Sequence, residues 1–145
     1  MNKLNNFKDT LIFETQKQFY DERGKGARYR MTTVGVSFFK NEIKDLKDTQ
    51  GISDWLKNNG FCQDISLTDE GIAVKMVVKG CCLKNVDAQF FRRNKQPLSC
   101  PLSNLIMHSL ELNGSNPPEL CSVDFEGDTC TAKIAKMFTS DVVGR

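Results

Sequence analysis

The chain has 145 residues and a mass of 16.4 kDa, and since no linker or internal repeat divides it, we predict that residues 1–145 form a single domain. Apolar residues make up 39% of the chain and charged residues 26%, and no apolar run approaches the roughly 18 residues that cross a bilayer, which excludes a membrane-spanning protein. The net charge of +2 argues against a nucleic-acid partner, although residues 23–30 and 90–95 are locally basic. Residues 1–19 lack the continuous hydrophobic stretch of a secretory signal, so we expect a cytoplasmic protein.

The first helix is predicted over residues 1–24. Leu4, Phe7 and Leu11 recur at helical spacing and predict its apolar face. Gly24 is suited to end the helix.

Two further helices are predicted before the first strand. Residues 31–46 mix β-branched and aromatic residues with helical spacing, and we interpret this segment as a helix. Ser53 is a candidate N-cap for a short helix that ends at Gly60.

A β-hairpin follows, because apolar residues alternate with polar ones on both sides of the TDEG sequence at residues 68–71. If these four residues form the loop, Leu67 pairs with Ile72 and Ile65 with Val74 on one apolar face.

A helix is predicted from residue 97 onward, with Ser99 or Cys100 at its cap and Pro101 in its first turn. Its buried stripe is expected to contain Leu102, Leu105, Ile106 and Leu110. A second hairpin occupies the last third of the chain. The order predicts an α+β domain: N-terminal helices, then an antiparallel sheet of two hairpins with an intervening helix packed on one face.

Six cysteines are many for a cytoplasmic protein of this size, and in a reducing compartment a cysteine cluster favours metal binding or reactivity over a disulfide framework. Cys82 ends a predicted strand, Cys100 begins a helix, and Cys121 and Cys130 flank a hairpin turn. These four segments could converge at one end of the sheet and hold one metal ion, with zinc as the first candidate. Strand alternation favours Cys82 as the ligand, and Cys81 is the alternative.

The turn between Cys121 and Cys130 decides whether these two residues can share a metal. If residues 124–127 form a four-residue loop, the two cysteines lie opposite each other, with Cβ atoms roughly 4.5–5.5 Å apart. If Gly127 and Asp128 are the whole turn, Cys121 lies about 13 Å along the strand from the residue opposite Cys130. No single ion could then bind both cysteines. The matching glycine in TDEG and DFEG makes us prefer the first register.

Two other interpretations of the cysteines stay open. They could be buried and inert, since free cysteine is among the most buried residue types. They could instead form a disulfide or redox pair, or hold an iron–sulfur cluster. Cys100 is then the best single thiolate candidate, because the orphan N–H groups of a helix N-terminus stabilise its charge.

Three stretches together resemble a known family: GIAVKMVVKGCC, CPLSNLIMHSL and PELCSVDFEGDTCTAKIAKM. In this order, over residues 71–137, they resemble the 4-vinyl reductase domain, a small-molecule-binding family that is also described as predicted hydrocarbon-binding. The resemblance implies an α+β domain with an apolar pocket between helices and sheet, found in sensory domains and in stand-alone proteins. It also implies zinc held by Cys100, Cys121 and Cys130, with Cys81 or Cys82 in the region that supplies the remaining ligand.

Four residues are candidates to line a ligand pocket: Phe90, Phe91, Leu105 and His108. The sequence contains no P-loop, dinucleotide fingerprint or nucleophile elbow that would indicate an enzyme. We therefore expect a non-enzymatic domain that binds or senses a small apolar or aromatic ligand and carries a structural cysteine-bound zinc. The alternatives are a cysteine-based redox or iron–sulfur protein and a dimeric interaction subunit, and a homodimer is one expected assembly.

Overall fold

A computed structural model describes residues 2–24, 31–97, 99–114 and 117–136. Its helices are α1 (Lys3–Arg23), α2 (Val36–Glu42), α3 (Thr49–Asn58), α4 (Lys84–Phe91) and α5 (Pro101–Leu112). Its strands are β1 (Asp64–Asp69), β2 (Ala73–Lys79), β3 (Glu119–Glu126) and β4 (Thr129–Ala135). The predicted α+β class, with helices first and a sheet of hairpins, is confirmed. Most of the first basic cluster and the last residue of the resemblance lie outside the described residues.

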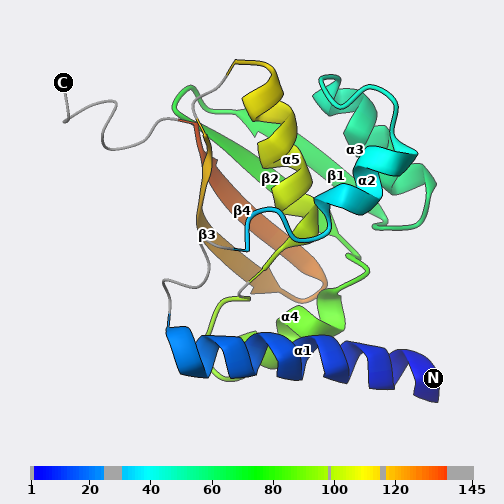
Figure 1. The fold of residues 1–145 in the computed structure, drawn as a ribbon, viewed down its shortest axis with the longest axis vertical. Coiled ribbons are helices and arrows are strands. Elements are labelled where there is room, and N and C mark those ends of the chain that lie inside the picture. Colours follow the sequence, from blue (N-terminus) through cyan, green and yellow to red (C-terminus); the bar gives the residue numbers. More distant parts are fainter. Residues whose placement is uncertain (1, 25–30, 98, 115–116, 137–145) are drawn as a thin grey trace.

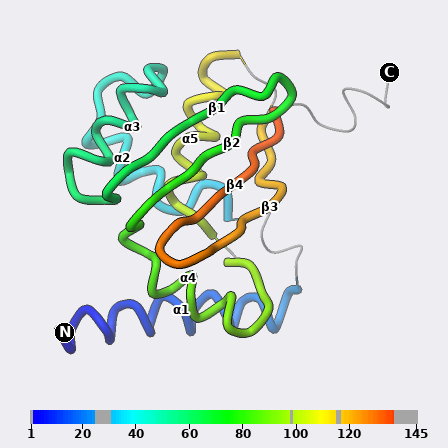
Figure 2. The backbone as a smooth tube through the Cα atoms, turned by 180° about the vertical axis from the view of Figure 1, so that it is seen from behind, coloured from blue at the N-terminus to red at the C-terminus, as the bar shows by residue number. Residues whose placement is uncertain are grey.

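The strands form one antiparallel sheet in the order β1-β2-β4-β3, so that the two hairpins join through β2 and β4. Helix α5 lies across one face of the sheet, with α2 and α3 beside it, and α1 lies along α4 at one end (Figure 1). Seen from behind, the sheet has no described helix across its other face (Figure 2). The domain therefore has one covered and one open sheet face, as antiparallel sheets commonly do.

The main core lies between the covered face and α5. Alternate strand residues and one stripe of α5 supply it because strands have a side-chain period of two and helices one of 3.6. The sheet contributes Ile65, Val74, Met76, Val78, Leu120, Val123, Cys130, Ala132 and Ile134, and α5 contributes Leu102, Leu105 and Ile106. The predicted buried stripe of α5 is thus confirmed for these three residues.

A second, smaller core lies between α1 and α4. It contains Phe13, Val86 and Phe90, and the rings of Phe13 and Phe90 meet edge to face at 4.8 Å. The predicted apolar face of α1 is not the side of the helix that is buried. Leu4, Phe7 and Leu11 are 53–62% exposed, because Phe13 on the opposite side of the helix is the residue that packs against α4.

The predicted register of the first hairpin is also wrong. Leu67 pairs with Met76 and Ile65 with Val78, and β1 extends through Asp69. The strand faces keep their predicted parity because the shift is an even number of residues, but Ile72 leaves the ladder and is 69% exposed.

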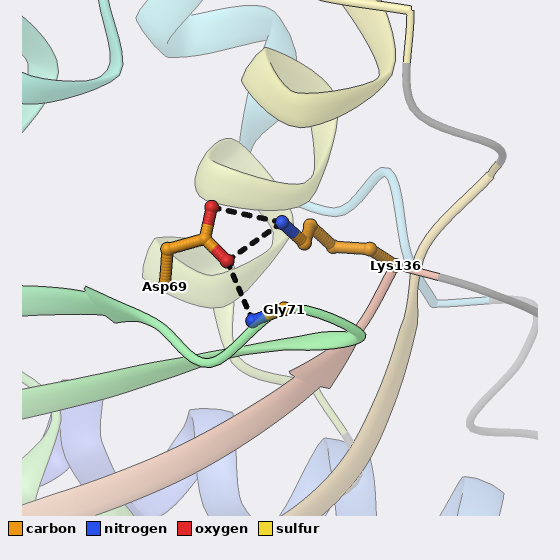
Figure 3. A network of polar contacts seen from close by, with 3 residues as sticks. All are labelled: Asp69, Gly71 and Lys136. Atoms are coloured by element: carbon orange, nitrogen blue, oxygen red, sulfur yellow. Dashed lines mark hydrogen bonds and ion pairs between the residues drawn. The ribbon is translucent and has the colours of Figure 1, made fainter.

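Asp69 is the physical reason for the shorter turn. Its carboxylate accepts a hydrogen bond from the Gly71 N–H at 2.9 Å, a local turn-forming bond, and an ion pair from Lys136 Nζ at 2.8 Å (Figure 3). Gly71 has a φ of +91°, which glycine adopts readily. The side chain of Lys136, just past β4, thus ties the two hairpins together at this end.

Helix caps match the sequence in one case and differ in another. Cys100 is the N-cap of α5 and Pro101 its first residue, as predicted. Helix α3 begins earlier than predicted, because the Asp48 carboxylate caps it by accepting from the Gly51 N–H at 3.0 Å, while Ser53 is buried inside the helix. Within the described residues, no helix combines the length and apolar character required to cross a bilayer.

Candidate functional site

The turn of the second hairpin contains two residues, Gly127 and Asp128, and Phe125 pairs with Cys130. The preferred four-residue loop is therefore wrong. Gly127 has a φ of +64°, as in the hairpin turn that places glycine at its first central position. The Asp128 carbonyl also accepts a hydrogen bond from the Gly80 N–H at 2.9 Å, which fixes the turn against the end of β2.

Cys121 is consequently separated from the other predicted ligands. It lies at a β-bulge between Leu120 and Ser122, it is exposed, and its thiol donates to the Glu119 carbonyl at 3.7 Å. Because Phe125 is the partner of Cys130, Cys121 is four residues, about 13 Å, further along the strand. The four-cysteine arrangement with Cys121 and Cys130 face to face does not form.

The other predicted cysteines do lie at one end of the sheet. Cys81 and Cys82 follow β2, Cys100 precedes α5, and Cys130 lies near the start of β4 opposite Val78. Cys81 and Cys130 are buried, whereas Cys82 is exposed. We call this group, with Asp87 described below, the cysteine end.

Cys100 does not have the stabilised charge expected of a helix N-terminus. Burial raises the pKa of its thiol, and the nearby Asp87 carboxylate raises it further. A hydrogen bond that Ser103 Oγ donates to Cys100 Sγ at 3.1 Å opposes this shift without reversing it. Burial likewise raises the pKa of Cys130, with the neighbouring Cys100 and Asp87 adding to the effect.

Cys81 and Cys82 behave as a vicinal pair. A hydrogen bond between the two thiols raises the pKa of Cys81, which burial raises further, and lowers the pKa of Cys82. The Leu83 N–H donates to Cys81 Sγ at 3.4 Å, and the Cys82 N–H donates to the Phe61 carbonyl at 2.8 Å. Cys82 is therefore the more acidic and the more accessible thiol of the pair.

Asp87 is a site residue that sequence reasoning missed. It lies in the first turn of α4, only 6% of it is exposed, and burial raises the pKa of its carboxyl to about 7. Among the described residues its carboxylate has no hydrogen-bond or ion-pair partner, yet its charge influences Cys82, Cys100 and Cys130. The sequence did hold a signal: Asp87 shares the helical stripe of Val86 and Phe90, which are buried.

The cysteine end fits a metal by its chemistry but does not present an assembled site. Thiolates and a carboxylate are the donors that zinc uses in proteins. Among the described residues, however, no three histidine, cysteine, aspartate or glutamate side chains form a group that could hold a metal ion.

Neither of two surface cavities lined by described residues contains all four predicted pocket residues. Phe90 belongs to the smaller core and Leu105 to the main core. Phe91 stacks on Phe125, with ring centroids 5.5 Å apart, beside a surface hollow of about 860 Å³. His108 lines the other of these cavities, a groove near α5.

That groove, which we call the α2–α5 groove, has a volume of about 430 Å³. Both apolar and polar side chains line it: Thr32, Thr33, Val36, Ser37, Lys40, Asn104, Met107, His108, Glu111, Pro117 and Pro118. Asn104 Nδ2 donates to the carbonyls of Met31 and Val34 at 2.9 and 3.0 Å, so α5 holds the segment that leads into α2. Burial and the charge of Lys40 lower the pKa of His108, while Glu111 opposes them, and the net shift favours the neutral imidazole.

Comparisons with protein-family models, with curated proteins and with solved structures gave no match. The resemblance to the 4-vinyl reductase domain therefore stays a prediction.

Proposed function

We propose that the chain is a non-enzymatic module that binds a small apolar or aromatic molecule, and that the α2–α5 groove is its binding site. The observation that carries this proposal is the groove itself. Its volume of about 430 Å³ falls within the range of roughly 300–1,000 Å³ that small-molecule sites occupy. Val36, Met107 and Pro118 supply apolar walls, and a few polar groups, His108 among them, converge on the same space.

Chemical-shift mapping with 4-ethylphenol tests the site. We expect the amides of α2 and α5 that line the groove to shift on titration. Ser37→Trp fills the groove from its exposed rim and is expected to abolish these shifts, whereas Asn41→Trp, exposed on the same helix outside the groove, leaves them intact. Shifts that survive Ser37→Trp, or that gather at Phe91 and Phe125 instead, would contradict the proposal.

A second proposal concerns the cysteine end: Cys82, Cys100, Cys130 and Asp87 hold a structural zinc ion. It rests on Asp87, because a buried carboxylate without a partner beside three thiols is costly unless a cation or a proton balances it. Zinc would supply binding free energy that links the end of β2, the start of α5 and the second hairpin. Of the four donors, Cys100 is oriented by the hydrogen bond that Ser103 Oγ donates to its Sγ.

Metal analysis of protein purified without chelator tests this second proposal. We expect one zinc per chain, lost in Cys100→Ser and in Asp87→Asn but kept in Cys121→Ser, which removes an exposed thiol outside the cysteine end. Visible absorbance of the same sample distinguishes an iron–sulfur cluster. An absence of metal together with a melting curve that chelator leaves unchanged would refute it, as would loss of the metal in Cys121→Ser.

The homodimer also stays a proposal. The exposed stripe of Leu4, Phe7 and Leu11 on α1 supports it, since it is an apolar surface that a second copy could cover. Light scattering on the full chain measures the mass directly.

A further inference from the structure

We propose that the ligand of the α2–α5 groove is a zwitterion, a small molecule of the α-amino-acid class whose carboxylate and ammonium groups are carried on an apolar body. This inference rests on the proposed function, because it names the chemical class that the same groove recognises.

Two opposite charges on different helices carry the inference. Lys40 lies in the last turn of α2 and Glu111 in the last turn of α5, and both line the groove. Among the described residues neither side chain makes an ion pair or a hydrogen bond. Other charged pairs that join separate elements, such as Lys136 with Asp69, do meet directly. The groove thus presents one unpaired cation and one unpaired anion to whatever enters it.

His108 shows that both charges act on the same space. The positive charge of Lys40 lowers the pKa of His108 and the negative charge of Glu111 raises it, so the imidazole lies within the field of each. A neutral imidazole can donate one hydrogen bond and accept another. It can therefore bridge the two charged groups of one ligand.

Charge complementarity selects the ligand class. A ligand with a carboxylate alone meets repulsion from Glu111, and one with an ammonium alone meets repulsion from Lys40. A zwitterion with both groups on neighbouring atoms satisfies both side chains at once. Val36 and Met107, whose side chains are only 4% exposed, form the apolar floor against which the body of the ligand packs.

The size of the groove limits that body. A volume of about 430 Å³ is at the low end of ligand sites, which suits a molecule of the size of a single apolar amino acid better than a nucleotide cofactor.

Four probes that share one aromatic body and differ in charge test the inference on the full chain. L-Phenylalanine carries both charges, 3-phenylpropionate only the carboxylate, 2-phenylethylamine only the ammonium, and 4-ethylphenol neither. Calorimetry measures affinity, and amide chemical shifts report whether binding occurs in the groove. We expect L-phenylalanine to bind at least tenfold more tightly than any of the other three.

Charge-removing variants assign each contact. Lys40→Met is expected to reduce the affinity for L-phenylalanine to that of 2-phenylethylamine, and Glu111→Gln to reduce it to that of 3-phenylpropionate. Lys44→Met and Glu42→Gln are the matched controls, because both residues are exposed near the end of α2 but outside the groove, and they should leave affinity unchanged.

The outcomes separate the inference from the proposed function. If a probe with one charge or none shifts the groove amides and binds as tightly as L-phenylalanine, the zwitterion is refuted and the small-molecule site stands. If no probe shifts the groove amides, both are refuted. Equal effects of Lys40→Met and Lys44→Met would also overturn the inference, since the charge would then act from a distance.

Discussion

Cys82 is the residue at which exposure and a lowered pKa coincide. Its thiol shares a hydrogen bond with Cys81, which keeps the proton, so Cys82 carries the greater thiolate fraction. Alkylation follows the thiolate and its accessibility. We therefore expect iodoacetamide at pH 7, with chelator present to remove any metal, to label Cys82 several-fold faster than Cys121, which is also exposed, and to leave Cys100 and Cys130 unlabelled in the folded protein. Timed peptide mapping gives the rates, and labelling of Cys100 alongside Cys82 would contradict the assignment.

Asp87 gives the metal-free protein a characteristic pH dependence. Burial raises the pKa of its carboxyl from 3.8 to about 7, so between these values the folded chain binds the proton more tightly than the unfolded chain. The free energy of unfolding therefore falls as pH rises from about 4 to about 7, by at most about 4 kcal/mol for this shift.

Urea unfolding with chelator present, at pH 5 and at pH 8, measures this effect. Asp87→Asn should lose most of the decrease and be more stable than the wild type at pH 8. Asp54→Asn, exposed on α3, should follow the wild type at both pH values. Parallel pH profiles for wild type and Asp87→Asn would show that the carboxyl is not buried as described.

At the scale of elements, the sequence predicted which strand residues are buried but not how the hairpins turn. Alternation in TDEGIAVKMVV identifies Val74, Met76 and Val78 as one face, and this face is kept because the observed register differs from the predicted one by an even number of residues. The loops depend on contacts from elsewhere. Lys136 reaches Asp69 from the end of β4, and Gly80 at the end of β2 bonds the carbonyl of Asp128.

The cysteine end could be predicted only in part, because some of its features are local in the sequence and others depend on contacts between distant elements. Cys82, Cys100 and Cys130 could be placed at one end of the sheet because a strand end, a helix start and a strand start are local features of the sequence. Cys121 was placed wrongly because the glycine at position 127 is compatible with both a four-residue and a two-residue turn, and the chain forms the two-residue turn. Asp87 was missed because the thiols that its charge influences lie outside α4, and helical spacing alone does not reveal them.

The junction of α2 with α5 depends on a glycine. Gly35 has a φ of +86°, and a Cβ there would lie 2.9 Å from Pro101 Cβ, a rigid ring atom at the start of α5. Gly60 has a similar φ of +80°, but no atom lies within 4 Å of its Cβ position. Alanine at either position costs about 1–2 kcal/mol for the left-handed conformation.

We expect Gly35→Ala to destabilise the protein by about 1–3 kcal/mol more than Gly60→Ala, because only Gly35→Ala also forces α2 away from α5. Urea unfolding of the two variants measures the difference. Ligand shifts in the α2–α5 groove should weaken only in Gly35→Ala, and equal losses of stability would contradict the close approach.

At the scale of the whole molecule, two cores of unequal size divide the described chain. The main core joins the sheet to α5, while α1 packs mainly against α4 through Phe13 and Phe90. The sequence predicted α1 but not its buried side, because apolar residues occur on both sides of this helix and only the position of α4 decides between them. Leu4, Phe7 and Leu11 consequently add no burial to either core.

This division predicts that α1 opens separately from the sheet. Segments with few buried apolar contacts exchange amide hydrogens through local openings of lower free energy than global unfolding. Native-state hydrogen exchange should therefore give lower opening free energies for the α1 amides than for those of β2 and β4, the central strands.

Phe13→Ala tests this division. It removes the ring that packs against Phe90 and lies 4.6 Å from the Arg93 guanidinium, at a cost of about 3–5 kcal/mol to the packing of α1 on α4. Phe7→Ala, the same substitution at an exposed position of the same helix, should change exchange by less than about 0.5 kcal/mol. Because the sheet retains its own core, the amides of β4 should keep their protection in both variants. Equal losses of protection in α1 and β4 on Phe13→Ala would show that the two cores unfold as one.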